Sequence, residues 1–141
     1  MARLLVVLQF AAIATVIFPS GRPGALWTGL GIALAGVAWV GWTVRFNRWG
    51  NFNIRPEPRS GARLITDGPY RWVRHPMYLG SLVIALGACV AGPQVWRFAA
   101  WGILAIVLIA KARREERGLL AQFPEYESYR RGRAFLIPGL W

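Results

Sequence analysis

The chain has 141 residues, of which 55% are hydrophobic and only 16% are charged. Because soluble domains are usually about one quarter charged, this composition excludes a disordered chain and argues against an ordinary soluble domain. The length suits a single domain, 1–141. Seventeen Lys and Arg against six Asp and Glu give a net charge of +11. One cysteine and one histidine exclude an internal disulfide and zinc sites built from several thiolates or imidazoles, so no metal is expected.

Four apolar segments predict an all-α membrane protein, a polytopic helix bundle with about four transmembrane helices. A transmembrane helix needs about 20 residues; the second segment meets this length, the first is marginal, and the last two are short. Gly92-Pro93 is a turn signal that predicts a tight helical hairpin between the last two segments. The first segment has a second interpretation, a cleaved signal peptide with Arg3 as its basic region. The segments cover approximately residues 2–18, 24–44, 77–91 and 95–110.

The basic residues predict the orientation of the chain. The loop 45–76 and the tail 111–141 each carry seven Lys and Arg, together fourteen of the seventeen. Because cytoplasmic loops carry an excess of Lys and Arg, both termini, this loop and the helical tail are expected in the cytoplasm, at a prokaryotic inner or cell membrane. The same alternation explains the net charge by contact with membrane lipids, so no nucleic acid is expected as a partner.

Small residues recur four positions apart within the apolar segments. Such spacing lets helix backbones approach closely in lipid, and packing of the bundle is a sufficient reason for it. Cys89 is expected to be one of these packing residues and not a nucleophile. The pairs are Gly29 and Ala33, Gly31 and Ala35, Ala85 and Cys89, Gly87 and Ala91, and Ala88 and Gly92.

The first polar cluster, 64–80, precedes the third apolar segment. Pro76 suits the first position of a helix, which would place His75 at the N-cap and Tyr78 in the first turn. The free N–H groups of a helix start, with its positive dipole end, can bind a carboxylate or a phosphate. The alternative is a membrane re-entry point with Arg and Tyr at the level of the headgroups. Two arginines, Arg71 and Arg74, add positive charge nearby.

The second polar cluster, 111–123, follows the fourth apolar segment. In a helix that continues from that segment, Glu115 shares a stripe with Leu108 and Leu119 and is expected to point toward the bundle. The alternative is a solvated, charged helix end. Ionisable groups that face the inside of a membrane bundle are candidates for function. This cluster is therefore the second candidate site.

The two clusters together resemble a known family. Gly-Pro-Tyr at 68–70, Arg-His-Pro-x-Tyr-x-Gly at 74–80 and Glu-Glu-x-x-Leu-x-x-x-Phe at 115–123, with a helical hairpin before the last, follow one another along the chain. This order resembles the isoprenylcysteine carboxyl methyltransferases and the related phospholipid N-methyltransferases. The likeness covers roughly Arg55 to Pro138.

The resemblance implies an integral membrane enzyme that uses S-adenosylmethionine as methyl donor. The acceptor is expected to be a lipophilic molecule, with a carboxylate, amine or thiol of a lipid or prenyl-like substrate as the methylated group. Lys111 takes the position of a basic residue near this substrate. The residues implied in cofactor binding are Ala62, Arg63, Leu64, Ile65, Tyr70, His75, Pro76, Met77, Tyr78 and Glu115.

Glu115 is expected to accept hydrogen bonds from the ribose hydroxyls or the ammonium group of the donor. His75 is expected to serve binding and not base catalysis. A carboxylate or amine acceptor needs little base catalysis, whereas a thiol must lose a proton. The candidate bases for that case are Glu116, Tyr126 and Tyr129.

Two other functions remain open. Sterol-reductase-like membrane enzymes use NADPH and share an Arg-His-Pro-x-Tyr motif, but they typically have Asn and an acidic residue where this chain has Met77 and Ser81. The second is a non-catalytic, lipid-binding membrane subunit with the same scaffold. Binding of S-adenosylhomocysteine or of NADPH distinguishes the three.

Overall fold

The computed structural model describes residues 2–17, 24–47 and 64–139. Within these residues the chain is helical apart from turns and one isolated parallel β-bridge, between Val73 and Ala134. The all-α prediction is therefore confirmed. The helices are α1 (Ala2–Ile17), α2 (Leu26–Phe46), the 3₁₀-helix η2 (Gly68–Arg71), α3 (Pro76–Ala91), α4 (Val95–Gln122) and α5 (Tyr126–Arg131).

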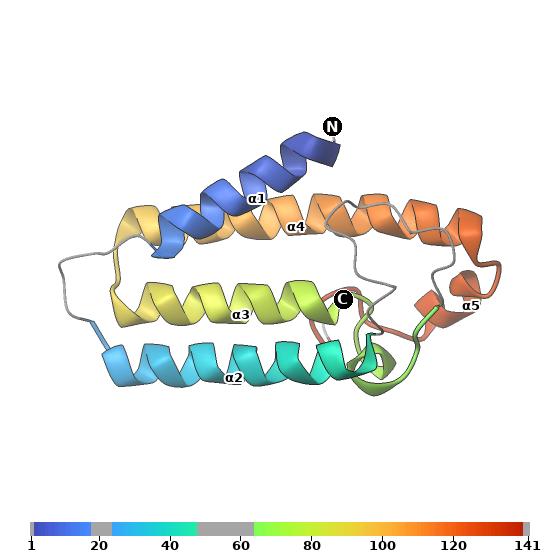
Figure 1. Ribbon diagram of the computed structural model, residues 1–141, viewed down its shortest axis with the longest axis horizontal. Helices are drawn as coiled ribbons and strands as arrows, with labels where there is room; N and C mark the ends of the chain where they lie inside the picture. The colour runs from blue at the N-terminus through green and yellow to red at the C-terminus, as the bar shows by residue number, and fades with distance from the viewer. Residues whose placement is uncertain (1, 18–23, 48–63, 140–141) are drawn as a thin grey trace.

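The long helices form a bundle in which α3 lies between α2 and α4 (Figure 1). The predicted hairpin is present, because α3 ends at Ala91 and α4 begins at Val95. Helix α1 crosses α4 obliquely and also contacts α3 (Figure 1). The end of α2, η2, the start of α3, the last turns of α4, and α5 gather at one end of the bundle, so this end brings together the two polar clusters (Figure 1).

Two helices, α2 and α4, are long and apolar enough to cross a membrane. The apolar parts of α1 and α3 are shorter, at Arg3–Ile17 and Pro76–Ala91. The predicted span at 95–110 is only the first part of α4, which continues as one helix to Gln122. The structure thus shows a helical bundle with two helices of spanning length where the sequence predicted four.

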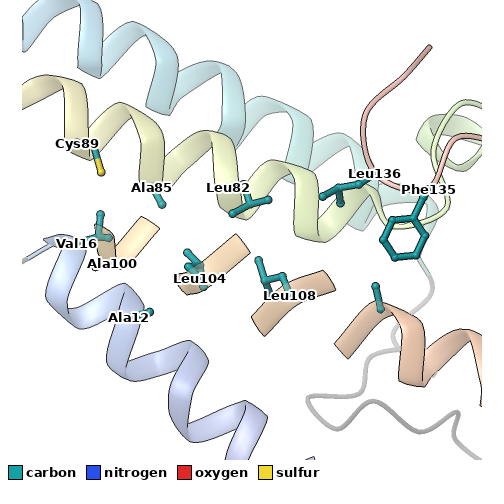
Figure 2. Packing of buried hydrophobic residues seen from close by; sticks show 11 residues of the cluster. Ala12, Val16, Leu82, Ala85, Cys89, Ala100, Leu104, Leu108, Phe135 and Leu136 are labelled. Carbon is teal, nitrogen blue, oxygen red and sulfur yellow. The ribbon is translucent and has the colours of Figure 1, made fainter. Parts of the chain in front are cut away.

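The core is built from α1, α3, α4 and the segment after α5 (Figure 2). Leu104 and Leu108 of α4 are almost fully buried and lie between the other elements. Cys89 is also fully buried, in agreement with its prediction as a packing residue. The remaining members are Ala12, Val16, Leu82, Ala85, Ala100, Ala112, Phe135 and Leu136.

Polar side chains inside the bundle satisfy backbone groups of α3. Arg97, the charged residue within the fourth apolar segment, donates from Nη1 to the carbonyls of Ala88 (2.9 Å) and Gly92 (2.7 Å), at the end of α3. The Ala88 carbonyl also accepts the backbone amide of Gly92 at 3.3 Å, whereas a carbonyl beyond the last turn, such as that of Gly92, has no partner within the helix. Trp101 donates from Nε1 to the carbonyl of Leu82 at 2.9 Å. These contacts account for the burial of Arg97, and no bound ligand is needed to explain it.

Helices α2 and α3 pack so closely that glycine is required at their contact. A Cβ added at Gly87 would lie 2.6 Å from the carbonyl oxygen of Gly29 and 2.6 Å from the amide nitrogen of Ala33. The predicted close approach is confirmed for this pair of helices. The pair at Gly31 does not take part, because no atom lies within 4 Å of a Cβ built there.

A valine at Gly87 is therefore expected to destabilise the protein. Its side chain has to displace the backbone of α2, and such overpacking costs roughly 1–3 kcal/mol. The matched control is Gly31→Val, which adds the same atoms to α2 where no neighbour lies within 4 Å. Thermal unfolding of the purified protein in detergent measures both. Equal unfolding temperatures for the two variants would contradict the close contact.

Candidate functional site

The candidate site begins at the start of α3. Pro76 is the first residue of this helix and His75 is its N-cap, as predicted, but the His75 side chain makes no capping hydrogen bond. Pro76 is fully buried, and its carbonyl accepts a hydrogen bond from Nε1 of Trp39 at 2.9 Å. This hydrogen bond ties the start of α3 to α2. The His75 side chain, which makes no capping hydrogen bond, turns toward α4.

The buried His75 ring faces two carboxylates of α4. Its Nε2 lies 3.2 Å from Oε1 of Glu116, and its Nδ1 lies 3.8 Å from Oε2 of Glu115. The sequence predicted that His75 lies beside Arg74 and the positive helix end, in a polar cluster distinct from 111–123. The structure instead places the first polar cluster directly against the second, so the two form one site.

The two glutamates differ from the prediction in their burial. Glu116 is the buried one, with 11% of its side chain exposed against 35% for Glu115. The buried stripe of α4 runs from Leu104 and Leu108 to Ala112 and then to Glu116, each four residues after the last. Glu115 lies beside this stripe and keeps one side open, so the expectation that it points into the bundle is correct only in part.

Glu116 is occupied by protein groups. Besides His75, it accepts a hydrogen bond from the hydroxyl of Tyr126 at 3.1 Å. Nε of Arg74 lies 3.2 Å from the same oxygen and forms an ion pair with it. The direction of this N–H does not suit a hydrogen bond, and Arg74 Nε is buried without an aligned acceptor among the described residues. Glu116 therefore organises the site, and Arg74 retains a donor.

The segment after α5 covers this network. The amide of Arg74 donates to the carbonyl of Ala134 (2.9 Å), and the amide of Ala134 donates to the carbonyl of Trp72 (3.1 Å). This bridge brings the ring of Phe135 to 5.1 Å from that of His75 and under the guanidinium of Arg74, whose Cζ lies 5.2 Å from the ring. Phe135 was not among the predicted site residues.

Tyr78 and Lys111 lie on the other side of His75. The Tyr78 ring stacks on the imidazole, 5.6 Å away, and its hydroxyl donates to Oε2 of Glu115 at 3.1 Å. Lys111 is buried, and its ammonium donates to the side-chain oxygen of Gln9 and lies 5.6 Å from the Tyr78 ring. Gln9 was missed by the sequence analysis, although an amide within the first apolar segment was a signal for it.

The phenols of this region donate hydrogen bonds, and burial raises their pKa values. Burial, followed by the charge of Glu116, raises the pKa of Tyr126 above its ordinary value. Burial also raises the pKa of Tyr129 to about 12, and its hydroxyl donates to the carbonyl of Tyr70 at 2.7 Å. Burial and the charge of Glu115 likewise raise the pKa of Tyr70. These raised pKa values argue against the interpretation of Tyr126 and Tyr129 as candidate bases.

The remaining predicted residues either have apolar side chains or lie outside the described part of the chain. Leu64 and Ile65 are half-buried in the segment that leads to η2. Met77 is half-buried, and its carbonyl accepts the hydroxyl of Ser81 at 2.9 Å. Ala62 and Arg63 lie outside the described residues. Within the described part of the chain, no group of three or more His, Cys, Asp and Glu side chains is arranged to hold a metal ion.

This geometry offers two binding functions side by side. Glu115 is a half-exposed carboxylate, oriented by Tyr78, that can accept hydrogen bonds or pair with a cation. Arg74 offers a donor to an anion, beside the positive end of the α3 dipole. The model of one protein family, described as phospholipid methyltransferase, matches residues 24–125, which include both groups. The chain belongs to the phospholipid methyltransferase family. The resemblance found in the sequence is thereby confirmed.

Relatives of this phospholipid methyltransferase family member include enzymes of sulfur methylation. The chain is 32% identical to methanethiol S-methyltransferase 2 of Bradyrhizobium diazoefficiens over 84% of its length, and 29% identical to the methanethiol S-methyltransferase of Mycobacterium tuberculosis over 97%. It is 34% identical over 58% to the cobalt-zinc-cadmium resistance protein CzcN of Cupriavidus metallidurans. The chain spans 52%, 59% and 38% of these relatives' own lengths, respectively.

Proposed function

We propose that this protein transfers a methyl group from S-adenosylmethionine to a lipophilic thiol at the cytoplasmic face of a membrane. The observation that carries the proposal is the half-exposed carboxylate of Glu115, oriented by Tyr78 next to the buried His75. Among the carboxylate, amine and thiol acceptors expected from the sequence, the thiol is favoured by the two relatives named methanethiol S-methyltransferases.

The charged groups of the site fit the methyl donor. S-adenosylmethionine, when bound, supplies the methyl group from its sulfonium and also carries a carboxylate, an ammonium and ribose hydroxyls. Glu115 can accept hydrogen bonds from the ammonium or the hydroxyls. Arg74, whose buried Nε has no aligned acceptor among the described residues, can donate to the carboxylate together with the start of α3.

The acceptor thiol must lose its proton before or during transfer, because the thiolate is the nucleophile. The raised pKa values of Tyr126 and Tyr129 disfavour them as bases, and Glu116 is held by His75, Arg74 and Tyr126. Glu115 is the carboxylate of the site with an open side, so we assign it the second role of accepting this proton. His75, whose two nitrogens face the glutamates, orients them and does not act as the base.

The length of α4 supports a position at the membrane boundary. About 20 helical residues cross a hydrocarbon core of about 30 Å. Of the 28 residues of α4, roughly the last eight, from Glu115 onward, then extend past the core. The site would lie where a lipophilic acceptor arrives from the membrane and a water-soluble donor arrives from the cytoplasm. Lys111, one turn earlier, would face the acceptor.

Titration of the detergent-purified chain with S-adenosylhomocysteine and with NADPH tests the proposal. We expect binding of the first and none of the second, and transfer of a radiolabelled methyl group to an alkanethiol. NADPH binding alone would favour a reductase, and binding of neither ligand by a folded protein would favour a lipid-binding subunit. Donor binding with transfer only to amines or carboxylates would contradict the thiol as acceptor but support S-adenosylmethionine as methyl donor.

A further inference from the structure

A basic hollow lies on the surface next to the covered side of the candidate site. It has a volume of about 470 Å³ and is open to solvent. Arg71 and Trp72 line it from the end of η2, and Arg131 and Arg133 line it from the end of α5 and the segment that follows. The proposed methyl transfer uses none of these four side chains.

The positive charge of the hollow exceeds what neighbouring carboxylates neutralise. Arg131 donates from Nε and Nη2 to Oε1 of Glu127 at 3.2 Å, but this carboxylate is shared with a second arginine on α5. Arg133 donates from Nη1 to the carbonyl of Gly132 at 3.0 Å. The exposed Arg71 has no hydrogen bond or ion pair with any residue that the structure describes. The hollow therefore offers several guanidinium N–H groups to an anion.

The aromatic and apolar side chains beside the hollow are typical of a protein surface at the level of lipid headgroups. Trp72 is 49% exposed, and its ring lies 5.4 Å from that of Trp42, near the end of α2. Helix α2 has the length and composition of a membrane span, and tryptophans are enriched where spans meet the headgroups. Ile137, which precedes the lining residue Pro138, is 46% exposed. A soluble phosphate would not need this apolar border.

We propose that this hollow binds the phosphate group of an anionic membrane lipid. The planar guanidinium fork matches the oxygens of a phosphate, and basic residues near a membrane surface are attracted to anionic lipids. The lipid would be a fixed ligand and not the methyl acceptor, because neither Glu115 nor its hydrogen-bond partner Tyr78 lines the hollow. The bound lipid would hold the end of α5 against the membrane.

Native mass spectrometry of the full chain in detergent tests this site with short-chain phosphatidylglycerol as the probe. We expect Arg71→Gln and Arg133→Gln each to weaken lipid binding about fivefold, and the double variant about 25-fold. The matched control is Arg117→Gln, an exposed arginine at the same end of the bundle that does not line the hollow. Its lipid binding should equal that of the unmodified chain, and all variants should keep the same unfolding temperature.

Two further ligands distinguish the phosphate of a lipid from a soluble phosphate. Short-chain phosphatidylcholine has the same phosphodiester with a compensating positive charge, and sn-glycerol 3-phosphate has the phosphate without acyl chains. Both are expected to bind more weakly than phosphatidylglycerol. Equal binding of glycerol phosphate would overturn the lipid assignment in favour of a soluble anion. An equal loss in Arg117→Gln would show that attraction is spread over the whole surface and that the hollow is not a site.

Discussion

Replacing Glu116 by alanine is expected to lower the free energy of unfolding by about 3–5 kcal/mol, because removing one partner of a buried ion pair leaves the other charge without compensation. The Arg74 side chain is only 14% exposed and its Nε has no aligned acceptor among the described residues even in the intact site. The variant also leaves the hydroxyl of Tyr126 and Nε2 of His75 without their acceptor. Denaturant unfolding in detergent measures the loss.

Two further variants separate this effect from the removal of any acidic residue. Glu127→Ala removes an exposed carboxylate that pairs with Arg130 and Arg131, and little change is expected there. Glu116→Gln keeps an acceptor for Tyr126 but loses the charge, so its stability should fall between alanine and the unmodified chain. A Glu116→Ala protein as stable as Glu127→Ala would show that the network does not hold the fold.

Replacing Glu115 by glutamine is expected to weaken binding of S-adenosylhomocysteine by about ten- to a hundredfold, with the fold intact. A charge-assisted hydrogen bond is worth roughly 1.5–3 kcal/mol, and the half-exposed Glu115 has a side open to a ligand. Because Tyr78 still has an amide oxygen to donate to, the unfolding temperature should hardly change. Isothermal titration of the purified variant measures the affinity.

The matched control for this prediction is Glu125→Gln, an exposed carboxylate at the same end of the bundle. This variant should bind S-adenosylhomocysteine with the same affinity as the unmodified chain. Unchanged affinity in Glu115→Gln would remove Glu115 from the donor site and favour a solvated helix end. Reduced affinity in the folded Glu116→Gln variant alone would instead assign the donor contact to the buried carboxylate.

Local sequence signals predicted the helices well where residue chemistry alone determines the backbone. Pro76 fixed the first turn of α3, because proline lacks the N–H that such a position leaves unused. Gly92-Pro93 marked the connection between α3 and α4, and Gly68-Pro69 marked the turn that the structure shows as η2. Small residues spaced four positions apart predicted close helix packing, which the structure shows between α2 and α3 at Gly87.

The site depended on information that no local pattern contains. The stripe through Leu108 predicted that Glu115 faces the bundle, but the rotation of α4 against α3 makes Glu116 the buried carboxylate. Phe135 reached His75 only through the bridge between Val73 and Ala134, which are 61 positions apart in the sequence. Such long-range pairing depends on the tertiary arrangement and not on periodicity.

The bridge between Val73 and Ala134 also sets an order in which the parts of the site assemble during synthesis. A ribosome delivers Arg74, His75 and Glu116 to the membrane before it delivers Tyr126 and Phe135, which cover them. For that interval the nascent chain presents the charged cluster without the side chains that cover it. Docking of the segment after α5 therefore completes the site only after α3 and α4 have been made.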